Sequence, residues 1–161
     1  MSPGPRVKTA SGEDEARLQY AALPYRLKDG LEVLLVSSRE TKRWVLPKGW
    51  PMKSRKPHSA AAREAMEEAG LVGKIEKKAA GFYHYQKRLK NGATVLCRVQ
   101  VFPMLVVKQR KSWPEMDQRT TQWFRAPEAA NAVAEPELQN VIRQFETAMA
   151  SPPRKPKPKK A

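Results

Sequence analysis

Three glutamates within one alanine-rich segment constrain this chain more than any other feature. Glu64, Glu67 and Glu68 stand at positions i, i+3 and i+4 of a run that follows Pro57 and contains no glycine or proline before Gly70. Such a run favours a helix, and on a helix this spacing places all three carboxylates on one face. Like charges at this spacing repel each other by roughly 0.2–0.5 kcal/mol per pair. The pattern is that of a solvated acidic face or, because Mg²⁺ binds carboxylate oxygens together with substrate phosphates, of a metal site.

The residues on either side extend this pattern. The chain resembles the Nudix hydrolase signature, Gly-x5-Glu-x7-Arg-Glu-U-x-Glu-Glu-x-Gly-U with U a bulky apolar residue, at Gly49, Arg63, Glu64, Glu67, Glu68, Gly70 and Leu71. It departs from the signature at Arg55, which stands where the family has its first Glu, and Ala65 is small for its apolar position. The preceding segment from Trp44 to Gly49, Trp-Val-Leu-Pro-Lys-Gly, extends the resemblance.

The resemblance implies an α/β fold, a Nudix-type α/β/α sandwich with a mixed sheet and a central catalytic helix. In that family the glutamates matched by Glu64, Glu67 and Glu68 bind Mg²⁺ or Mn²⁺, and the carbonyl matched by Gly49 often adds a ligand. Such ions neutralise pyrophosphate oxygens and acidify the water that attacks phosphorus. Glu64 is in addition a candidate general base, a role that family members assign to different residues.

Arg63 occupies the position that orients the carboxylates in the family. Its customary partner is replaced by Arg55, but Arg63 can still reach Glu67 at i+4. We therefore expect Arg63 to belong to the catalytic group and the substitution at position 55 to weaken the support of the metal ligands without abolishing activity.

Basic residues crowd the start of the signature. Lys48, in Pro-Lys-Gly, resembles the lysine that faces phosphate in dinucleoside polyphosphate hydrolases; the alternative is a surface lysine. Arg43, Lys53 and Arg55 lie close to it in sequence. This density of cations suits a substrate with many phosphates, so all four residues are candidate substrate ligands.

Two later segments supply further candidates. Glu115 lies in a polar loop on the side where Nudix enzymes often take an extra metal-binding or basic Glu, and it is our candidate for a further metal ligand; the alternative is a solvated residue. Arg119, followed by Trp123-Phe124, resembles diphosphoinositol polyphosphate phosphohydrolases, in which the Trp-Phe pair is structural. The aromatic pair Tyr83 and Tyr85 fits a strand in the core or a base-stacking surface.

Composition indicates which partners the protein attracts and in which compartment it resides. The net charge of +15 attracts polyanions. The single cysteine, Cys97, lies in an apolar run and excludes a disulfide within the chain, which fits a buried thiol and a cytoplasmic location. We expect no signal peptide, and the apolar stretch from Ala93 to Val107 is too short, and too interrupted by Arg98, to span a membrane.

The hydrophobic pattern predicts strands and two full helices along one domain. The predicted strands are 18–27, 31–37, 44–46, 75–89, 93–107 and 120–124, with hairpin turns at 28–30 and 90–92 and helices from Pro57 to Gly70 and over 135–148. We expect 1–16 to be a mobile extension, 17–150 the Nudix domain, and 151–161 a disordered tail. That tail carries five basic residues and is a candidate for weak nucleic-acid contact or for a solubilising role.

These features favour a metal-dependent hydrolase of a phosphoanhydride bond, acting on a dinucleoside polyphosphate or a diphosphoinositol polyphosphate. The 5′ end of an RNA is an alternative substrate because of the charge. The alternative of another class is a Nudix module that binds a nucleotide or RNA without turnover, which Arg55 favours and the intact Arg-Glu-x-x-Glu-Glu disfavours. The sequence leaves the oligomeric state open.

Overall fold

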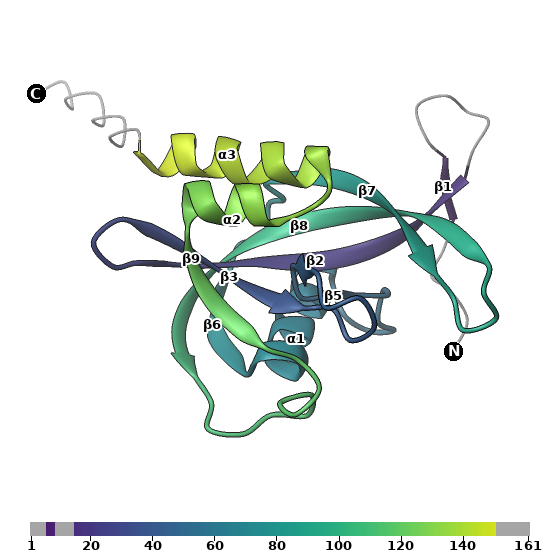
Figure 1. The fold of residues 1–161 in the computed structure, drawn as a ribbon, viewed down its shortest axis with the longest axis horizontal. Helices are drawn as coiled ribbons and strands as arrows, with labels where there is room; N and C mark the ends of the chain where they lie inside the picture. Colours follow the sequence, from purple (N-terminus) through teal and green to yellow (C-terminus); the bar gives the residue numbers. More distant parts are fainter. Residues whose placement is uncertain (1–5, 9–14, 151–161) are drawn as a thin grey trace, which may run out of the picture.

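The computed structural model describes residues 6–8 and 15–150. In these residues nine strands form one mixed sheet, with helix α1 (Pro57–Ala69) on one face and α2 (Ala126–Ala132) and α3 (Pro136–Ala150) on the other (Figure 1). The strands are β1 (Arg6–Lys8), β2 (Glu15–Leu27), β3 (Leu31–Ser37), β4 (Trp44–Val45), β5 (Lys48–Gly49), β6 (Leu71–Ile75), β7 (Gly81–Arg88), β8 (Thr94–Gln109) and β9 (Thr121–Arg125). The predicted α/β/α sandwich is confirmed.

Strands β2 and β8 form the centre of the sheet. They run parallel over nine residue pairs, from Arg17↔Cys97 to Tyr25↔Leu105, whereas the other named pairings are antiparallel. Strands β1, β3 and β5 pair with β2, strands β6 and β7 pair with β8, and β4 and β9 pair with β3. A parallel pair requires a long crossover, and here the crossover carries α1 across one face.

The two predicted hairpin turns are confirmed by backbone angles. Asp29 and Gly30 have φ of 52° and 120° between β2 and β3, and Gly92 has φ of 85° between β7 and β8. Positive φ at these positions matches the right-handed twist of the flanking strands, which is why Asp-Gly and Asn-Gly predict such turns well.

The single strand predicted over 75–89 is wrong. The chain forms two strands, β6 and β7, which pair antiparallel with two halves of β8, and it also extends the first of them back to Leu71. The break lies opposite Pro103, between the pairs Ile75↔Met104 and Gly81↔Val101. Proline has no backbone N–H to donate to a neighbouring strand, so the ladder is interrupted there.

The start of the chain and the start of α1 also differ from expectation. Arg6–Lys8 and Glu15–Ala16, assigned above to a mobile extension, lie in strands β1 and β2. Residues 1–5 and 9–14 and the predicted tail 151–161 lie outside the described residues. At the start of α1, Lys56 is the N-cap residue without a side-chain cap bond, and the hydroxyl of Ser59, which could have served as a cap, accepts a hydrogen bond from Arg55.

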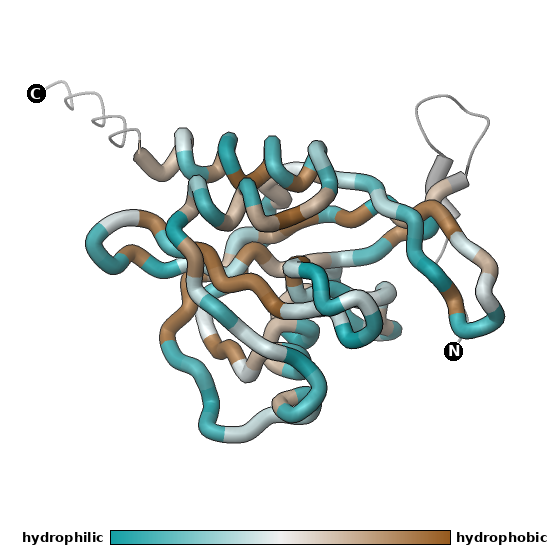
Figure 2. The backbone as a smooth tube through the Cα atoms, in the orientation of Figure 1, coloured by the Kyte–Doolittle hydropathy of each residue, from teal (hydrophilic) through white to brown (hydrophobic). Residues whose placement is uncertain are grey.

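The core is divided by the sheet into two clusters. One lies under α2 and α3 and contains the predicted apolar face of α3, and the other lies between the sheet and the alanine side of α1. In Figure 2 hydrophobic residues follow the strands between the helices, while the loop after β8 is largely hydrophilic. Cys97 is fully buried, as predicted. Within the described residues no helix has the length and hydropathy to cross a membrane.

The core cluster under α2 and α3 should contribute to the stability of the folded protein, and this can be tested. Ile142 is fully buried on α3, so Ile142→Ala should lower the free energy of unfolding by about 2–5 kcal/mol. Val107→Ala is the control, since Val107 is 66% exposed and should change stability by no more than about 0.5 kcal/mol. Urea unfolding of both variants measures this, and an equal loss in the two would contradict the assignment of the core.

Candidate active site

Helix α1 presents the signature glutamates as predicted. It runs from Pro57, whose missing N–H suits the first turn, to Ala69, and it ends at Gly70 in the left-handed conformation with φ of 69°. The Gly70 N–H donates to the Met66 carbonyl at 2.9 Å and closes the last turn. Two of the three carboxylates, those of Glu64 and Glu68, thereby reach the short strand β5.

Glu64 and Glu68 form the centre of the cluster. Only 3% of Glu68 is exposed, its carboxylate accepts the Lys48 backbone N–H at 3.3 Å, and it shares a side-chain hydrogen bond with Glu64. The Glu64 carboxylate lies directly against Gly49, where a Cβ would overlap it. Pairing of Lys48 and Gly49 with β2 fixes this approach, so glycine at position 49 is a requirement of space.

The cluster holds more negative charge than its surroundings favour. Burial, the hydrogen bond with Glu68 and the neighbouring carboxylates raise the pKa of Glu64 to about 9. Burial also raises the pKa of Glu68, against the opposing effects of Arg119 and Lys48. Burial in turn lowers the pKa of the Lys48 ammonium, although Glu68 counteracts this. A bound cation would relieve the repulsion between these carboxylates.

Arg63 makes the contact predicted for it. Its Nε lies 2.9 Å from Glu67 Oε1 on the outer side of α1, where both side chains are partly exposed. Arg55, which replaces the first Glu of the signature, is exposed and donates to the Ser59 hydroxyl at 3.2 Å. The departure from the signature therefore leaves the Arg63–Glu67 pair intact.

Glu115 approaches the same cluster from the loop between β8 and β9. Arg119 Nε lies 2.9 Å from Glu115 Oε1 and 3.7 Å from Glu68 Oε1, so one guanidinium joins the loop to the helix. Another nitrogen of Arg119 donates to the Ser37 carbonyl at 3.2 Å. In the sequence Arg119 is recognisable only as part of a motif, because nothing in a loop sequence indicates a contact with a residue on a distant helix.

The residues fit a divalent cation in chemistry but are not arranged around one. Hard carboxylate oxygens from α1 and the loop are the donors that Mg²⁺ prefers, and they repel each other without it. Within residues 6–8 and 15–150, however, no group of three or more His, Cys, Asp or Glu side chains is placed to hold a metal ion. Glu67 is engaged by Arg63 and Glu115 by Arg119, so ligation would require these ion pairs to rearrange.

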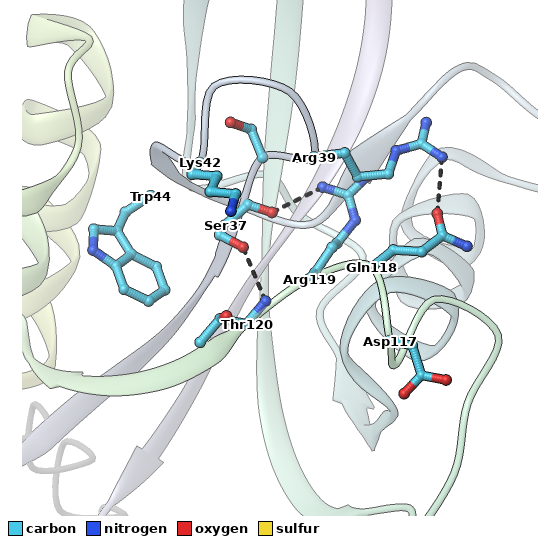
Figure 3. A pocket seen from close by; sticks show the side chains of 9 residues that line it. Ser37, Arg39, Lys42, Trp44, Asp117, Gln118, Arg119 and Thr120 are labelled. Atoms are coloured by element: carbon cyan, nitrogen blue, oxygen red, sulfur yellow. Dashed lines mark hydrogen bonds between the residues drawn. The ribbon is translucent and has the colours of Figure 1, made fainter.

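A pocket of about 350 Å³ opens beside this cluster. It is lined by Ser37, Ser38, Arg39, Lys42, Trp44, Asp117, Gln118, Arg119 and Thr120. Figure 3 shows Trp44 at one side and the hydrogen-bonded pair Arg39–Gln118 at the other, with Arg119 bonded to the Ser37 carbonyl. Three cations and one acid line the pocket, which gives it a positive balance. Arg119 belongs both to this pocket and to the carboxylate cluster.

The other candidates are spread more widely. Lys48 lies inside the site, with its ammonium 4.9 Å from the centre of the Tyr85 ring. Arg43 is exposed and bonds to Thr41 in its own loop, and Lys53 is exposed beside Arg55. The roles of these residues as substrate ligands remain predictions.

Of the two tyrosines on β7, one lies in the core. Tyr83 is buried, whereas Tyr85 is half-buried and donates from its hydroxyl to Gln19 at 2.6 Å. His84, between them, is a hydrogen-bonding residue, since its ring and its backbone N–H both contact Glu137 at 3.0 Å. Trp123 and Phe124 are structural, packing on Arg26 and Trp44.

Comparisons with known proteins agree with this arrangement. A family model described as NUDIX domain matches residues 17–145. Nudix hydrolase 18, mitochondrial, of Arabidopsis thaliana is 34% identical over 124 residues, covering 72% of this chain and 68% of the plant protein. Diphosphoinositol polyphosphate phosphohydrolase 3-alpha of Mus musculus is 34% identical over 112 residues, covering 68% of this chain and 64% of the mouse protein. The crystal structure of C. elegans Ap4A hydrolase has the same fold, with a TM-score of 0.61 at 19% identity, covering 84% of this chain and 99% of the other.

The family match includes β2, α1 and the loop of Glu115, which are the elements that build the site described above. It also covers most of the chain, and the signature residues on α1 lie within it. This chain belongs to the NUDIX family and is a hydrolase of pyrophosphate-containing substrates.

Proposed function

We propose that this protein hydrolyses a phosphoanhydride bond in a small polyphosphorylated molecule, with Mg²⁺ or Mn²⁺ as its cofactor. The observation that carries the proposal is the position of Arg119, which touches Glu68 in the carboxylate cluster and also lines the positive pocket. A substrate with phosphates in the pocket would present its next phosphoanhydride bond to the carboxylates. Guanidinium and ammonium groups bind such phosphates strongly.

Two substrate classes fit this site best. A diphosphoinositol polyphosphate would place several phosphates against Arg39, Lys42 and the two serines, and the mouse relative is named for this class. A dinucleoside polyphosphate would use the same cations and could stack a base on Trp44. The similar C. elegans fold belongs to an Ap4A hydrolase. We retain both classes, since the cations serve either one.

The side chains of the cluster have distinct proposed tasks. Glu64, Glu67 and Glu68, with Glu115 and the Gly49 carbonyl, would hold the ion, which when bound neutralises phosphate oxygens and acidifies a water. Glu64 lies against Gly49 at the centre of the cluster and would accept a proton from the attacking water once a bound cation keeps its carboxyl ionised. Arg63 keeps Glu67 in place. Lys48 and Arg119 flank Glu68 and offer positive charge to the departing phosphate.

Other functions are the alternatives to be tested. The net charge of +15 favours hydrolysis at an RNA 5′ end, and the engaged Glu67 and Glu115 favour a module that binds without turnover. The basic residues 151–161, proposed to make a weak nucleic-acid contact, lie outside the described residues. A cytoplasmic location stays a proposal that rests on the single buried thiol.

A substrate panel tests the proposal. Wild-type protein should release phosphate or nucleotide from a diphosphoinositol polyphosphate or a dinucleoside polyphosphate with Mg²⁺ and not with EDTA. Glu68→Gln should lower kcat on the order of 100-fold, the usual size for loss of one group that stabilises charge in a transition state. Products are identified by chromatography. Tight binding of these compounds without turnover would instead support the binding module.

Glu64→Gln should stabilise the metal-free protein while it impairs catalysis. The pKa of Glu64 is raised from 4.5 to about 9 in the folded chain, so the folded state becomes less stable relative to the unfolded state as pH rises through that interval. Glutamine does not titrate and avoids this loss. The variant should therefore have a higher Tm than wild type at about pH 8, by a few degrees since about 1 kcal/mol shifts Tm by roughly 2–4 °C in a domain of this size.

Thermal unfolding in EDTA across the pH range measures the effect. The difference in Tm between variant and wild type should shrink toward about pH 5, where Glu64 approaches protonation in the unfolded chain as well as in the folded one. A difference that is the same at both ends would show that Glu64 is not held in a repulsive environment.

Arg39→Ala should weaken substrate binding without changing the chemical step. Arg39 lines the pocket and is away from the carboxylates, so we expect KM to rise about 10-fold or more, as for loss of a hydrogen bond to a charged group, with kcat nearly unchanged. Arg88→Ala is the matched control, because it removes the same charge from the exposed end of β7. An equal rise in KM for both variants would mean that net charge, and not the pocket, attracts the substrate.

A further inference from the structure

The loop between β8 and β9 carries two residues of the proposed site but has little apolar content to give it a shape. Its ends are fixed by backbone bonds. The Arg110 N–H donates to the Gly70 carbonyl at 2.8 Å, and Thr120 exchanges hydrogen bonds with Ser37 at 2.9 Å. Between these ends the chain must still bring Glu115 to the carboxylates of α1.

Trp113 contacts the helix in the middle of this loop. Its indole lies against Gly70, so close that a Cβ on Gly70 would overlap the ring. Gly70 ends α1 in the left-handed conformation, which presents bare backbone to the ring. The Trp113 Nε1 is buried and has no hydrogen-bond partner within the described residues. Since a buried donor without a partner is unfavourable, packing and not hydrogen bonding must hold the indole here.

The backbone leads directly from this contact to Glu115. The Met116 N–H donates to the Trp113 carbonyl at 3.2 Å and closes a turn, and inside this turn the Glu115 N–H donates to the Glu67 carbonyl at 3.0 Å. The Glu115 carboxylate then meets Arg119 at 2.9 Å, and Arg119 lies 3.7 Å from Glu68. The indole thus lies on the same short stretch of backbone as Glu115, and Glu115 in turn contacts Arg119.

We propose that Trp113 is a positioning residue for the hydrolytic reaction: its indole, seated on Gly70, holds Glu115 and through it Arg119 beside Glu68. The catalytic part of this inference rests on the function proposed above, whereas the structural part does not. Without the ring, the middle of the loop would be placed only by one backbone hydrogen bond to Glu67 and by the partly solvated ion pairs of Arg119.

Amide hydrogen exchange tests the structural part without any activity. In Trp113→Ala the Glu115 amide should exchange at least about 10-fold faster than in wild type, because the loop opens locally, while amides inside α1 such as that of Ala65 keep their protection. Trp123→Ala is the matched control, since Trp123 is also half-buried but stacks on Arg26. Unchanged exchange at Glu115 in Trp113→Ala would overturn the proposal.

A double-mutant cycle tests the catalytic part. If Trp113 acts through Glu115, Trp113→Ala should lower kcat as much as Glu115→Gln does, and the double variant should lose nothing more. Trp123→Ala should reduce Tm and leave kcat unchanged in both the wild-type and the Glu115→Gln backgrounds. Full multiplication of the Trp113→Ala and Glu115→Gln losses would show that Trp113 has a merely structural role.

Conservative variants keep the test valid if Trp113→Ala does not fold. Trp113→Phe retains a ring for Gly70 and removes the buried unpaired N–H, so it should keep most of the wild-type kcat and the protection of the Glu115 amide, with a Tm no lower than wild type. Trp113→Leu replaces Trp113→Ala in the cycle if needed. Loss of activity in Trp113→Phe as large as in Glu115→Gln would contradict positioning by ring packing. If wild type hydrolyses no pyrophosphate at all, the proposed function fails, and the exchange experiment still decides the structural part.

Discussion

The buried carboxyl pair of Glu64 and Glu68 is the constraint on which the rest of this structure depends. Two acidic groups on adjacent turns of a helix, one of them almost without solvent contact, are unfavourable unless the surrounding backbone and cations compensate. Compensation arrives from three directions: the Lys48 N–H from β5, the guanidinium of Arg119 from the loop after β8, and, in the function proposed here, a metal ion. The fold serves to bring these groups together.

Two close contacts in and beside this cluster require a residue that has no side chain. The Glu64 carboxylate occupies the space of a side chain at Gly49, and the Trp113 ring occupies the space of one at Gly70. The two glycines lie near opposite ends of the signature, and each admits a close neighbour: Gly49 a carboxyl group of the proposed site, and Gly70 the ring that we propose to position the loop. The signature can therefore be understood as a description of packing as well as of chemistry.

Local features of the sequence were sufficient for much of the fold and for part of the site. The helix from Pro57 to Gly70, the Asp-Gly turn and the Arg63–Glu67 pair all depend on residues within a few positions of each other, and the structure contains them. The break between β6 and β7 depends on Pro103 in a partner strand, which no local pattern reveals. The bridge from Arg119 to Glu68 is likewise a contact between distant segments. Contacts within one helix were predictable from spacing, whereas contacts between distant elements were not, apart from the approach of Glu115, which the family resemblance indicated.

The proline in β8 also affects how this molecule meets others. A strand of 16 residues with an uninterrupted partner would leave that partner's outer edge as a long row of free N–H and C=O groups, open to a strand from another chain. Here the partner is divided into β6, of five residues, and β7, of eight, and Glu137 occupies the outward N–H of His84 on β7. The irregularity that disrupts the ladder is thus a safeguard against aggregation through edge pairing.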